Sequence, residues 1–130
     1  GSVHEVIEGM TGIDFENVLI GRISKVFKET SQLTLITDPD IKFGVNILNT
    51  DIRGMVKGDK NNLVLDLVPN DKELNIDDVV YSSFNQDVFP PNLLIGKVAK
   101  AKRSDLESFY KATVLPFFDE YSLNHILIIK

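Results

Sequence analysis

Few residues of this chain could serve as acid–base or nucleophilic groups. The histidines are His4 and His125, and the sequence contains no cysteine. A serine nucleophile needs a base within hydrogen-bond reach and a third group that orients this base. No serine lies in a Gly-x-Ser-x-Gly nucleophile elbow. Because His125 enters a terminal apolar stretch, we expect it to be a structural residue and not a catalytic base.

The carboxylate pairs of the sequence indicate turns. Asp38 and Asp40 flank Pro39, and Asp77-Asp78 precedes an apolar stretch. Aspartates in such places bond to nearby backbone groups, and neither pair lies in an apolar segment that would raise a carboxyl pKa for general acid catalysis. Other acidic residues lack calcium-loop spacing, namely Asp87, Asp105 and Glu107. We therefore expect no catalytic site, no metal and no cofactor.

Binding has more support than catalysis. The stretch from Phe84 to Pro91 puts two aromatic residues and two prolines in one loop. Loops often carry recognition sites, and aromatic side chains make good interface anchors. The candidate partner-binding residues are Phe84, Asn85, Asp87, Phe89 and Pro90. Phe89 could instead pack beneath the loop and plug a barrel end, which makes Phe84 the better candidate. A second aromatic group is expected in the core, namely Pro116-Phe117-Phe118 with Tyr121.

The charge distribution argues against nucleic acid as a partner. The chain has 14 basic and 19 acidic residues and a net charge of -5, whereas nucleic-acid binding normally requires a basic face. The local basic excess between Lys97 and Arg103 is expected to be a solvated strand end. One alternative stays open, a barrel of the OB type that binds nucleic acid or oligosaccharide, with residues 97–103 and Tyr110 as its platform.

The elements that carry these residues are predicted to be strands. In the segment Ile41–Ile47, apolar residues occupy every second position, which places them on one face of a strand. Helical turns could form at 71–80 and 119–124, but no longer helical period appears. Similar strand patterns occur at 18–27, 32–37, 63–68, 79–82, 93–101, 109–115 and 126–129. The predicted fold is all-β, with two small antiparallel β-barrels packed together and little helix.

A weak internal repeat supports two related sub-barrels. The segment Leu19-Ile20-Gly21-Arg22-Ile23-Ser24-Lys25 recurs at positions 94–100 as Leu-Ile-Gly-Lys-Val-Ala-Lys. Glycine within a strand pattern often marks a bulge or a sharp bend, so the same corner is predicted twice. The β region should span residues 3–130, and Gly1-Ser2 resemble an expression scar. No apolar run approaches the roughly 20 residues of a membrane span, so we expect a soluble fragment.

The order of several short motifs resembles the C-terminal β region of the MreC family of rod shape-determining proteins. Glu8-Gly9-Met10 followed by residues 19–23 is similar to the family's opening, and Leu33–Pro39 resembles its V-x-L-I-T-D strand and turn. Further similar motifs are Ile52–Gly58, Asn75–Ser83, Val88–Val98 and the terminal His125–Ile129. The resemblance covers roughly residues 6–129.

Three positions depart from the family pattern. Asp77 and Asn92 stand where the family usually has glycine, and Phe84 also replaces a glycine. Asp and Asn tolerate the left-handed backbone conformation, so these two can be accommodated. Phe84 implies a differently shaped loop.

The resemblance implies a function and a location. It implies a non-enzymatic scaffold of the cell-elongation machinery, on the extracytoplasmic face of the bacterial cytoplasmic membrane, that helps to maintain cell shape. The implied partners are a penicillin-binding transpeptidase, the membrane protein MreD and further copies of the chain. The family's membrane span precedes the β region and is absent from these residues, and the first barrel could be truncated.

Overall fold

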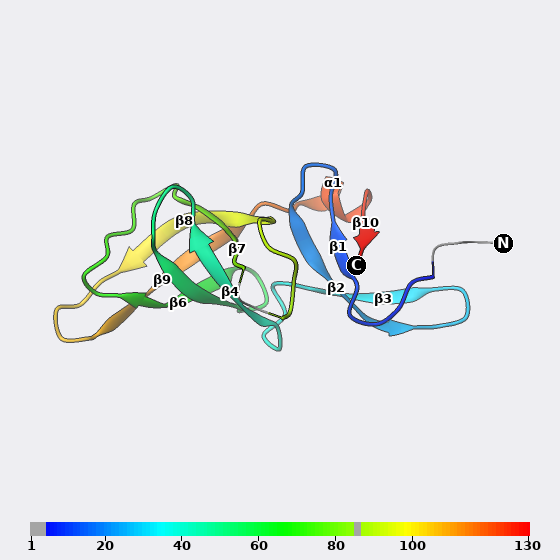
Figure 1. Ribbon diagram of the computed structural model, residues 1–130, viewed down its shortest axis with the longest axis horizontal. Helices are drawn as coiled ribbons and strands as arrows, with labels where there is room; N and C mark the ends of the chain where they lie inside the picture. The colour runs from blue at the N-terminus through cyan, green and yellow to red at the C-terminus, as the bar shows by residue number, and fades with distance from the viewer. Residues whose placement is uncertain (1–4, 85–86) are drawn as a thin grey trace.

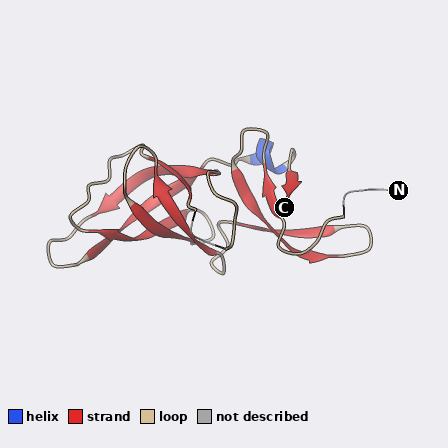
Figure 2. Cartoon of the chain, viewed as in Figure 1, coloured by secondary structure: helices blue, strands red, loops and turns tan. Residues whose placement is uncertain are grey.

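The structure is a computed structural model that describes residues 5–84 and 87–130. It contains ten strands and a single four-residue helix within these residues (Figure 2). The chain is therefore nearly all-β, as the alternating pattern predicts. The strands form two lobes side by side, and the first and last strands, β1 and β10, belong to the same lobe (Figure 1).

The first lobe is a closed antiparallel barrel, here called the barrel lobe. Its strands close in the order β4-β5-β6-β9-β8-β7. Their bounds are β4 Lys42–Ile47, β5 Arg53–Gly58, β6 Leu63–Pro69, β7 Val79–Ser82, β8 Leu94–Lys102 and β9 Phe109–Pro116. The alternation in β4 points Phe43, Val45 and Ile47 into the barrel, where each is about 1% exposed. Closure hides the strand edges and buries the apolar face without a helical layer.

The second lobe is a four-stranded antiparallel sheet, here called the sheet lobe. Its order is β10-β1-β2-β3, and the pairing of the described residues leaves β10 and β3 as edges. Its elements are β1 Thr11–Ile13, β2 Leu19–Val26, β3 Ser31–Leu35, β10 Leu127–Ile129 and the short helix α1, Glu120–Leu123. Asp119 caps α1, because its carboxylate accepts a hydrogen bond from the Ser122 backbone N–H at 3.0 Å.

The sequence patterns missed two strands and predicted one helical turn wrongly. β1 is short, and β5 contains two glycines, which weakens its strand signal. Residues 71–78 form turns without helix, and the segment leads directly into β7. The helical turn predicted at 119–124 is present as α1.

The two copies of the sequence repeat occupy equivalent corners. Gly21 pairs with Leu35 and Gly96 with Pro116, and both ladders shift register just beyond, after Ile23 and after Val98. A Cβ atom on Gly21 would lie 2.1 Å from the Thr34 carbonyl oxygen, and one on Gly96 would lie 2.1 Å from the Leu115 carbonyl oxygen. Each glycine thus allows a close approach of the partner strand's backbone.

The equivalence extends to the neighbouring strands and turns. Thr11 pairs with Arg22 as Val79 pairs with Lys97, which makes β1 the counterpart of β7. Asn17 and its counterpart Asn92 both have left-handed backbones, with φ of 63° and 65°. Gly9 and Asp77 are likewise counterparts, with φ of 92° and 73°. Asp77 and Asn92 therefore adopt the conformation that was expected of residues replacing glycine.

The first half of the chain, residues 5–70, supplies β4, β5 and β6 to the barrel lobe, and the second half, residues 71–130, supplies β10 to the sheet lobe. In the first half, the strand after β3 is β4, and it pairs with β7 of the second half. The strand after β9 is β10, and it pairs with β1 of the first half. The two pairings are equivalent: Ile47 of β4 pairs with Val80 of β7, and Ile128 of β10 pairs with Gly12 of β1, the residue equivalent to Val80. The fourth strand of each half, β4 or β10, thus lies in the lobe of the other half. The segment from β3 to β4 and the segment from β9 to α1 each run from one lobe to the other (Figure 1).

We expect Gly21→Ala to be more destabilising than Gly12→Ala, although the two glycines face each other in the β1–β2 ladder. The Cβ at position 21 would meet a backbone carbonyl, whereas at position 12 it meets only side-chain methyl groups, the nearest at 3.0 Å from Leu33. Gly21→Ala should lower the free energy of unfolding by about 2 kcal/mol or more. Urea denaturation measures both variants, and equal losses would contradict the close approach.

We also expect neither half of the chain to fold alone. Residues 5–70 would lack β10, and residues 71–130 would lack β4, β5 and β6. Each half would expose an unpaired strand edge and part of the core. Proton–nitrogen NMR spectra of each half should show poor dispersion, and mixing the halves should restore dispersion. A well-dispersed spectrum from either half by itself would contradict the exchange.

Candidate functional site

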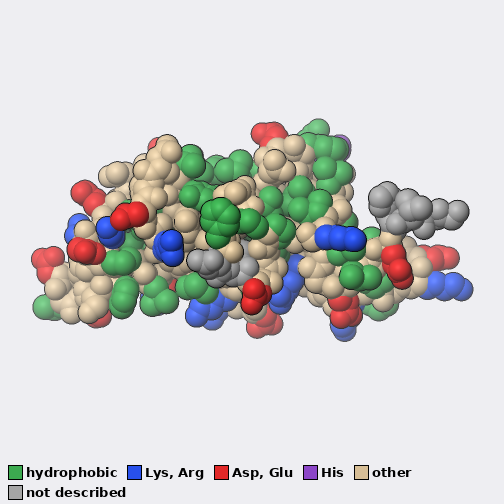
Figure 3. Space-filling model, viewed as in Figure 1, with side chains coloured by type: hydrophobic (Ala, Val, Ile, Leu, Met, Phe, Trp, Pro, Cys, Tyr) green, Lys and Arg blue, Asp and Glu red, His purple; other side chains and the backbone are tan. Residues whose placement is uncertain are grey.

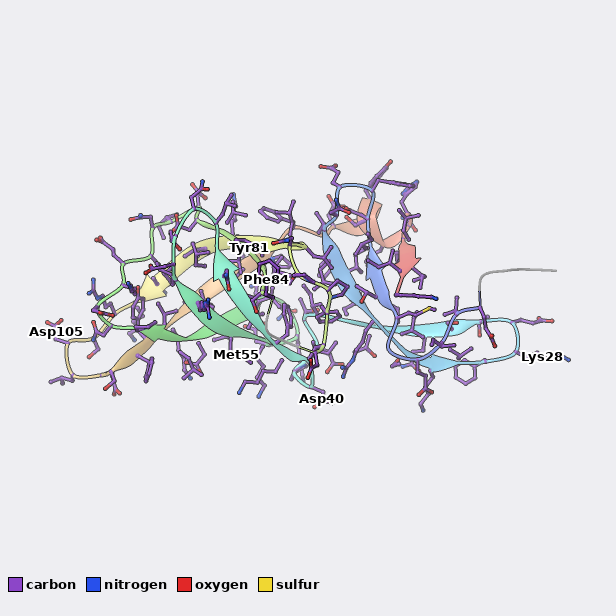
Figure 4. All side chains as sticks on the ribbon, viewed as in Figure 1. Lys28, Asp40, Met55, Tyr81, Phe84 and Asp105 are labelled. Carbon is purple, nitrogen blue, oxygen red and sulfur yellow. The ribbon has the colours of Figure 1, made fainter. Side chains whose placement is uncertain are left out.

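The loop after β7 presents Phe84 on the surface of the barrel lobe. Its side chain is 75% exposed, and it lies beside Tyr81 at the middle of the molecule (Figure 4). The chain on either side of the loop is held by hydrogen bonds. The Ser83 N–H donates to the Gly44 carbonyl at 3.1 Å, and the Ser82 hydroxyl donates to the Pro90 carbonyl at 2.6 Å. The exposed ring is therefore attached to a firmly positioned strand end.

The other candidates from this loop differ in their positions. Phe89 is 3% exposed, and its ring packs edge to face on Phe43 with 5.0 Å between centroids. Phe89 is therefore wrong as a partner-binding candidate at the surface; it packs beneath the loop in the barrel core, which is the alternative that the sequence had indicated for it. Asp87 is exposed and Pro90 is partly buried. Asn85 lies outside the described residues.

A hollow of about 240 Å³ lies beside Phe84 on the outer face of the barrel. Its floor is the β4–β5 ladder, in which Gly44 pairs with Met55 and Asn46 pairs with Arg53. Hydrophobic side chains gather on this face of the barrel lobe, next to the junction with the sheet lobe (Figure 3). We call this hollow and its aromatic rim the Phe84 hollow; its residues are Gly44, Asn46, Arg53, Met55, Ser83 and Phe84.

The Phe84 hollow contains an unsatisfied hydrogen-bond acceptor. The Asn46 Oδ1 atom is buried and has no donor in the described part of the chain. Buried acceptors of this kind are usually paired, because an unmade hydrogen bond costs about 1–3 kcal/mol. Arg53, which is exposed on the neighbouring strand, adds donors and a positive charge. The hollow thus offers a ligand an apolar surface and one cation, while the unpaired Asn46 oxygen lies buried beneath it.

The internal repeat explains why the hollow is open. In the sheet lobe the counterpart of Gly44 is His125, whose ring lies 6.4 Å from that of Phe15 in the loop between β1 and β2. In the barrel lobe Gly44 provides no side chain, and it lines the hollow beside the loop aromatic Phe84. The sequence analysis missed Gly44, Asn46 and Arg53. The sequence signal that could have identified this site was Gly44, a glycine at an outward-facing position of an otherwise regular strand.

The platform of the alternative OB-type reading is not formed as expected. Tyr110 is 4% exposed, and its hydroxyl donates to the Lys72 carbonyl at 2.6 Å and accepts from the Leu74 N–H at 3.1 Å. Its ring is therefore not free to stack on a base or a sugar. Lys97 lies 3.6 Å from the Asp77 carboxylate in an exposed ion pair. The only named aromatic of that platform belongs to the core.

The residues first considered for chemistry have structural contacts. The His125 ring stacks on Tyr121 with 4.1 Å between centroids, and its Nδ1 atom lies 2.9 Å from the Tyr121 carbonyl. Asp38 accepts from the Asp40 N–H at 2.8 Å, which is the turn contact that was predicted. Tyr121 is 66% exposed, so its predicted place in the core is wrong, while Phe117 and Phe118 are partly buried.

Over residues 5–84 and 87–130, no group of three His, Asp or Glu side chains converges as metal ligands would. Within the same ranges no helix has the length and apolar character needed to cross a bilayer.

Comparison with known proteins identifies relatives over the whole chain. The family model described as "Rod shape-determining protein MreC, barrel core" matches residues 1–130. The cell shape-determining protein MreC of Escherichia coli is 26% identical over 131 residues, which is 99% of this chain and 35% of that protein. The chain thus spans about a third of the length of this curated relative.

Solved structures share the fold. MreC from Pseudomonas aeruginosa superposes with a TM-score of 0.81 at 19% identity, covering 96% of this chain and 81% of that one. A structure of the major periplasmic domain of the cell shape-determining filament MreC gives 0.74 at 21% identity, covering 95% and 77%. The MreC chain in a complex with penicillin-binding protein PBP2 from Helicobacter pylori gives 0.74 at 21%, covering 98% and 82%. The family match over the full chain shows that this protein belongs to the MreC family of rod shape-determining proteins.

Proposed function

We propose that this chain is a non-enzymatic scaffold that binds cell-wall-synthesis proteins on the extracytoplasmic side of the bacterial membrane and so helps to maintain cell shape. Membership of the MreC family supports this role. A relative of the same fold is described as the major periplasmic domain of MreC, which supports the location. Another was solved in complex with PBP2, which supports a penicillin-binding protein as a partner.

The observation that carries the proposal is Phe84, a large aromatic side chain left exposed beside an open hollow. Aromatic residues, Met and Arg are enriched at protein interfaces, where a few such anchors supply most of the binding energy. The Phe84 hollow contains one of each, namely Phe84, Met55 and Arg53. Because the barrel beneath is closed and well packed, little order has to be gained on binding.

The chemistry of the hollow favours a polypeptide ligand. An apolar side chain would fill the space above Gly44, where the β4–β5 ladder provides no side chain of its own. Arg53 would pair with a carbonyl or carboxylate of the partner. The resemblance also implies MreD and further copies of the chain as partners, and these remain predictions.

We expect Phe84→Ala to weaken capture of the penicillin-binding transpeptidase by this chain. Loss of a buried aromatic anchor typically costs about 2 kcal/mol or more, which is roughly a thirtyfold rise in Kd. Surface plasmon resonance with the purified transpeptidase measures the change. The matched control is Phe27→Ala, because Phe27 is also exposed, at 56%, but belongs to the turn between β2 and β3.

Equal loss in the two variants would show a general effect of surface hydrophobicity. Equal binding by Phe84→Ala and the unchanged chain would remove the Phe84 hollow as the interface. A second variant, Gly44→Val, also tests the Phe84 hollow as the interface. It adds a β-branched side chain at an outward strand position and so should occupy part of the hollow. Binding should fall in this variant while the melting temperature is maintained.

Phe89→Ala should behave in the opposite way from Phe84→Ala. Phe89 is in the core against Phe43, so its truncation leaves a cavity and should cost about 3–5 kcal/mol of unfolding free energy. Phe84→Ala should change stability by no more than about 0.5 kcal/mol, because the side chain is at the surface. Chemical denaturation of both variants checks the contrast, and similar stabilities would show that Phe89 is not packed in the core.

A further inference from the structure

A second hollow lies where the two lobes meet, and the Phe84 site does not use it. It has a volume of about 320 Å³ and is walled by the aromatic rings of Phe15, Phe117 and Tyr121. These come from the β1–β2 loop, the crossing segment after β9, and α1. Val18 and Leu94 form its floor, where the lobes touch through a parallel bridge between these two residues. We call it the junction hollow.

The internal repeat shows what fills the corresponding place in the other half. The counterparts of Val18, Leu94 and Phe117 are Leu93, Leu19 and Ile36, and all three are buried in the same core cluster as Phe89. Phe89 belongs to the loop between β7 and β8. The counterpart loop between β1 and β2 is shorter. Equivalent residues are 68 positions apart before the loop (Gly9 and Asp77) and 75 positions apart after it (Asn17 and Asn92), so the second half has the longer loop. The short loop has no residue to serve as Phe89 does, so the junction hollow is open.

The rim of the junction hollow is acidic. Asp14, Glu16 and Asp119 line it, and the described residues that line it include no lysine or arginine. The two ion pairs among the described residues involve other acids, Asp51 and Asp77. Figure 3 shows acidic side chains next to a group of hydrophobic ones at the top of the sheet lobe. The counterpart of Asp14 is the neutral Ser82, so the charge of Asp14 has no equivalent in the other half.

Two of these carboxylates compete for one hydroxyl hydrogen. The Ser122 hydroxyl lies 3.2 Å from Asp14 Oδ2 and 3.2 Å from Asp119 Oδ1, and a hydroxyl has a single proton to donate. A hydrogen bond from the Ser122 backbone N–H holds the pKa of Asp119 below its usual value. Asp119 is therefore anionic near neutral pH, and a cation at the rim would be attracted to it.

We propose that the junction hollow is a second docking site, which takes a segment of another protein with an aromatic side chain next to a lysine or arginine. The aromatic ring would occupy the place that Phe89 fills in the other half. The cation would lie against the acidic rim and the exposed rings of Phe15 and Tyr121, which are 65% and 66% exposed; His125 covers one face of Tyr121.

The probes are three blocked tetrapeptides, acetyl-Gly-Phe-Arg-Gly-amide and its Phe-Glu and Ala-Arg versions. Proton–nitrogen NMR titration of the whole 130-residue chain follows the amides of Phe15, Tyr121 and Ser122. The Phe-Arg peptide should shift these amides. Its Kd should be lower by about tenfold or more than that of the Ala-Arg peptide, and by up to about fivefold than that of the Phe-Glu peptide.

Charge-reversal variants provide the matched control. Glu16→Lys should weaken Phe-Arg binding by up to about fivefold and shift the preference toward Phe-Glu. Glu29→Lys makes the same change of net charge in the β2–β3 turn and should have no effect. Phe84→Ala should also have no effect, because the junction hollow is independent of the site proposed above.

Three results would overturn the proposal. The first is equal affinity for all three peptides, and the second is the absence of shifts at the hollow amides at millimolar peptide. The third is a set of shifts at these amides that depends on protein concentration without peptide, which would assign the hollow to a second copy of the chain.

Discussion

The structure depends on one backbone constraint, the exchange of strands between its two halves. β4 hydrogen-bonds to β7, and β10 hydrogen-bonds to β1, so each lobe contains a strand that the other half of the chain supplies. Separating the lobes would break both ladders and expose their edges. The lobes are therefore one folding unit, even though each has its own sheet. The surfaces next to the junction inherit this rigidity.

The two halves repeat the same arrangement of strands and loops but place different side chains around the loops, and this difference explains where the hollows lie. The frame places a loop at the same point in each half, after β1 and after β7. In the sheet lobe His125 occupies the space beside the loop aromatic, whereas in the barrel lobe Gly44 leaves it open. In the barrel lobe Phe89 fills the space beneath the loop, whereas in the sheet lobe the shorter loop leaves that space open. Each half thus indicates what the other half's hollow would accommodate.

This arrangement suits a scaffold of the MreC family. Its titratable side chains serve turns, caps and surface ion pairs, as Asp38, Asp119 and Lys97 illustrate. The closed barrel presents the exposed Phe84 beside a hollow, and a preorganised anchor such as the one we propose reduces the entropy that binding must offset. Two hollows of different chemistry, one with Arg53 and one with an acidic rim, could distinguish between two ligands by charge.

The amino-acid sequence by itself determined the features that depend on local patterns. Period-two alternation predicted the all-β class and most strands, the matching glycine segments predicted a repeated corner, and Asp77 and Asn92 were predicted to tolerate a left-handed backbone. Only the tertiary structure decided that Phe89 and Tyr110 are buried while Phe84 and Tyr121 are exposed. The same holds for the strand exchange and for the opening beside Gly44. The reason is physical: alternation states which side chains share a face, but the neighbour that covers this face comes from a strand distant in sequence.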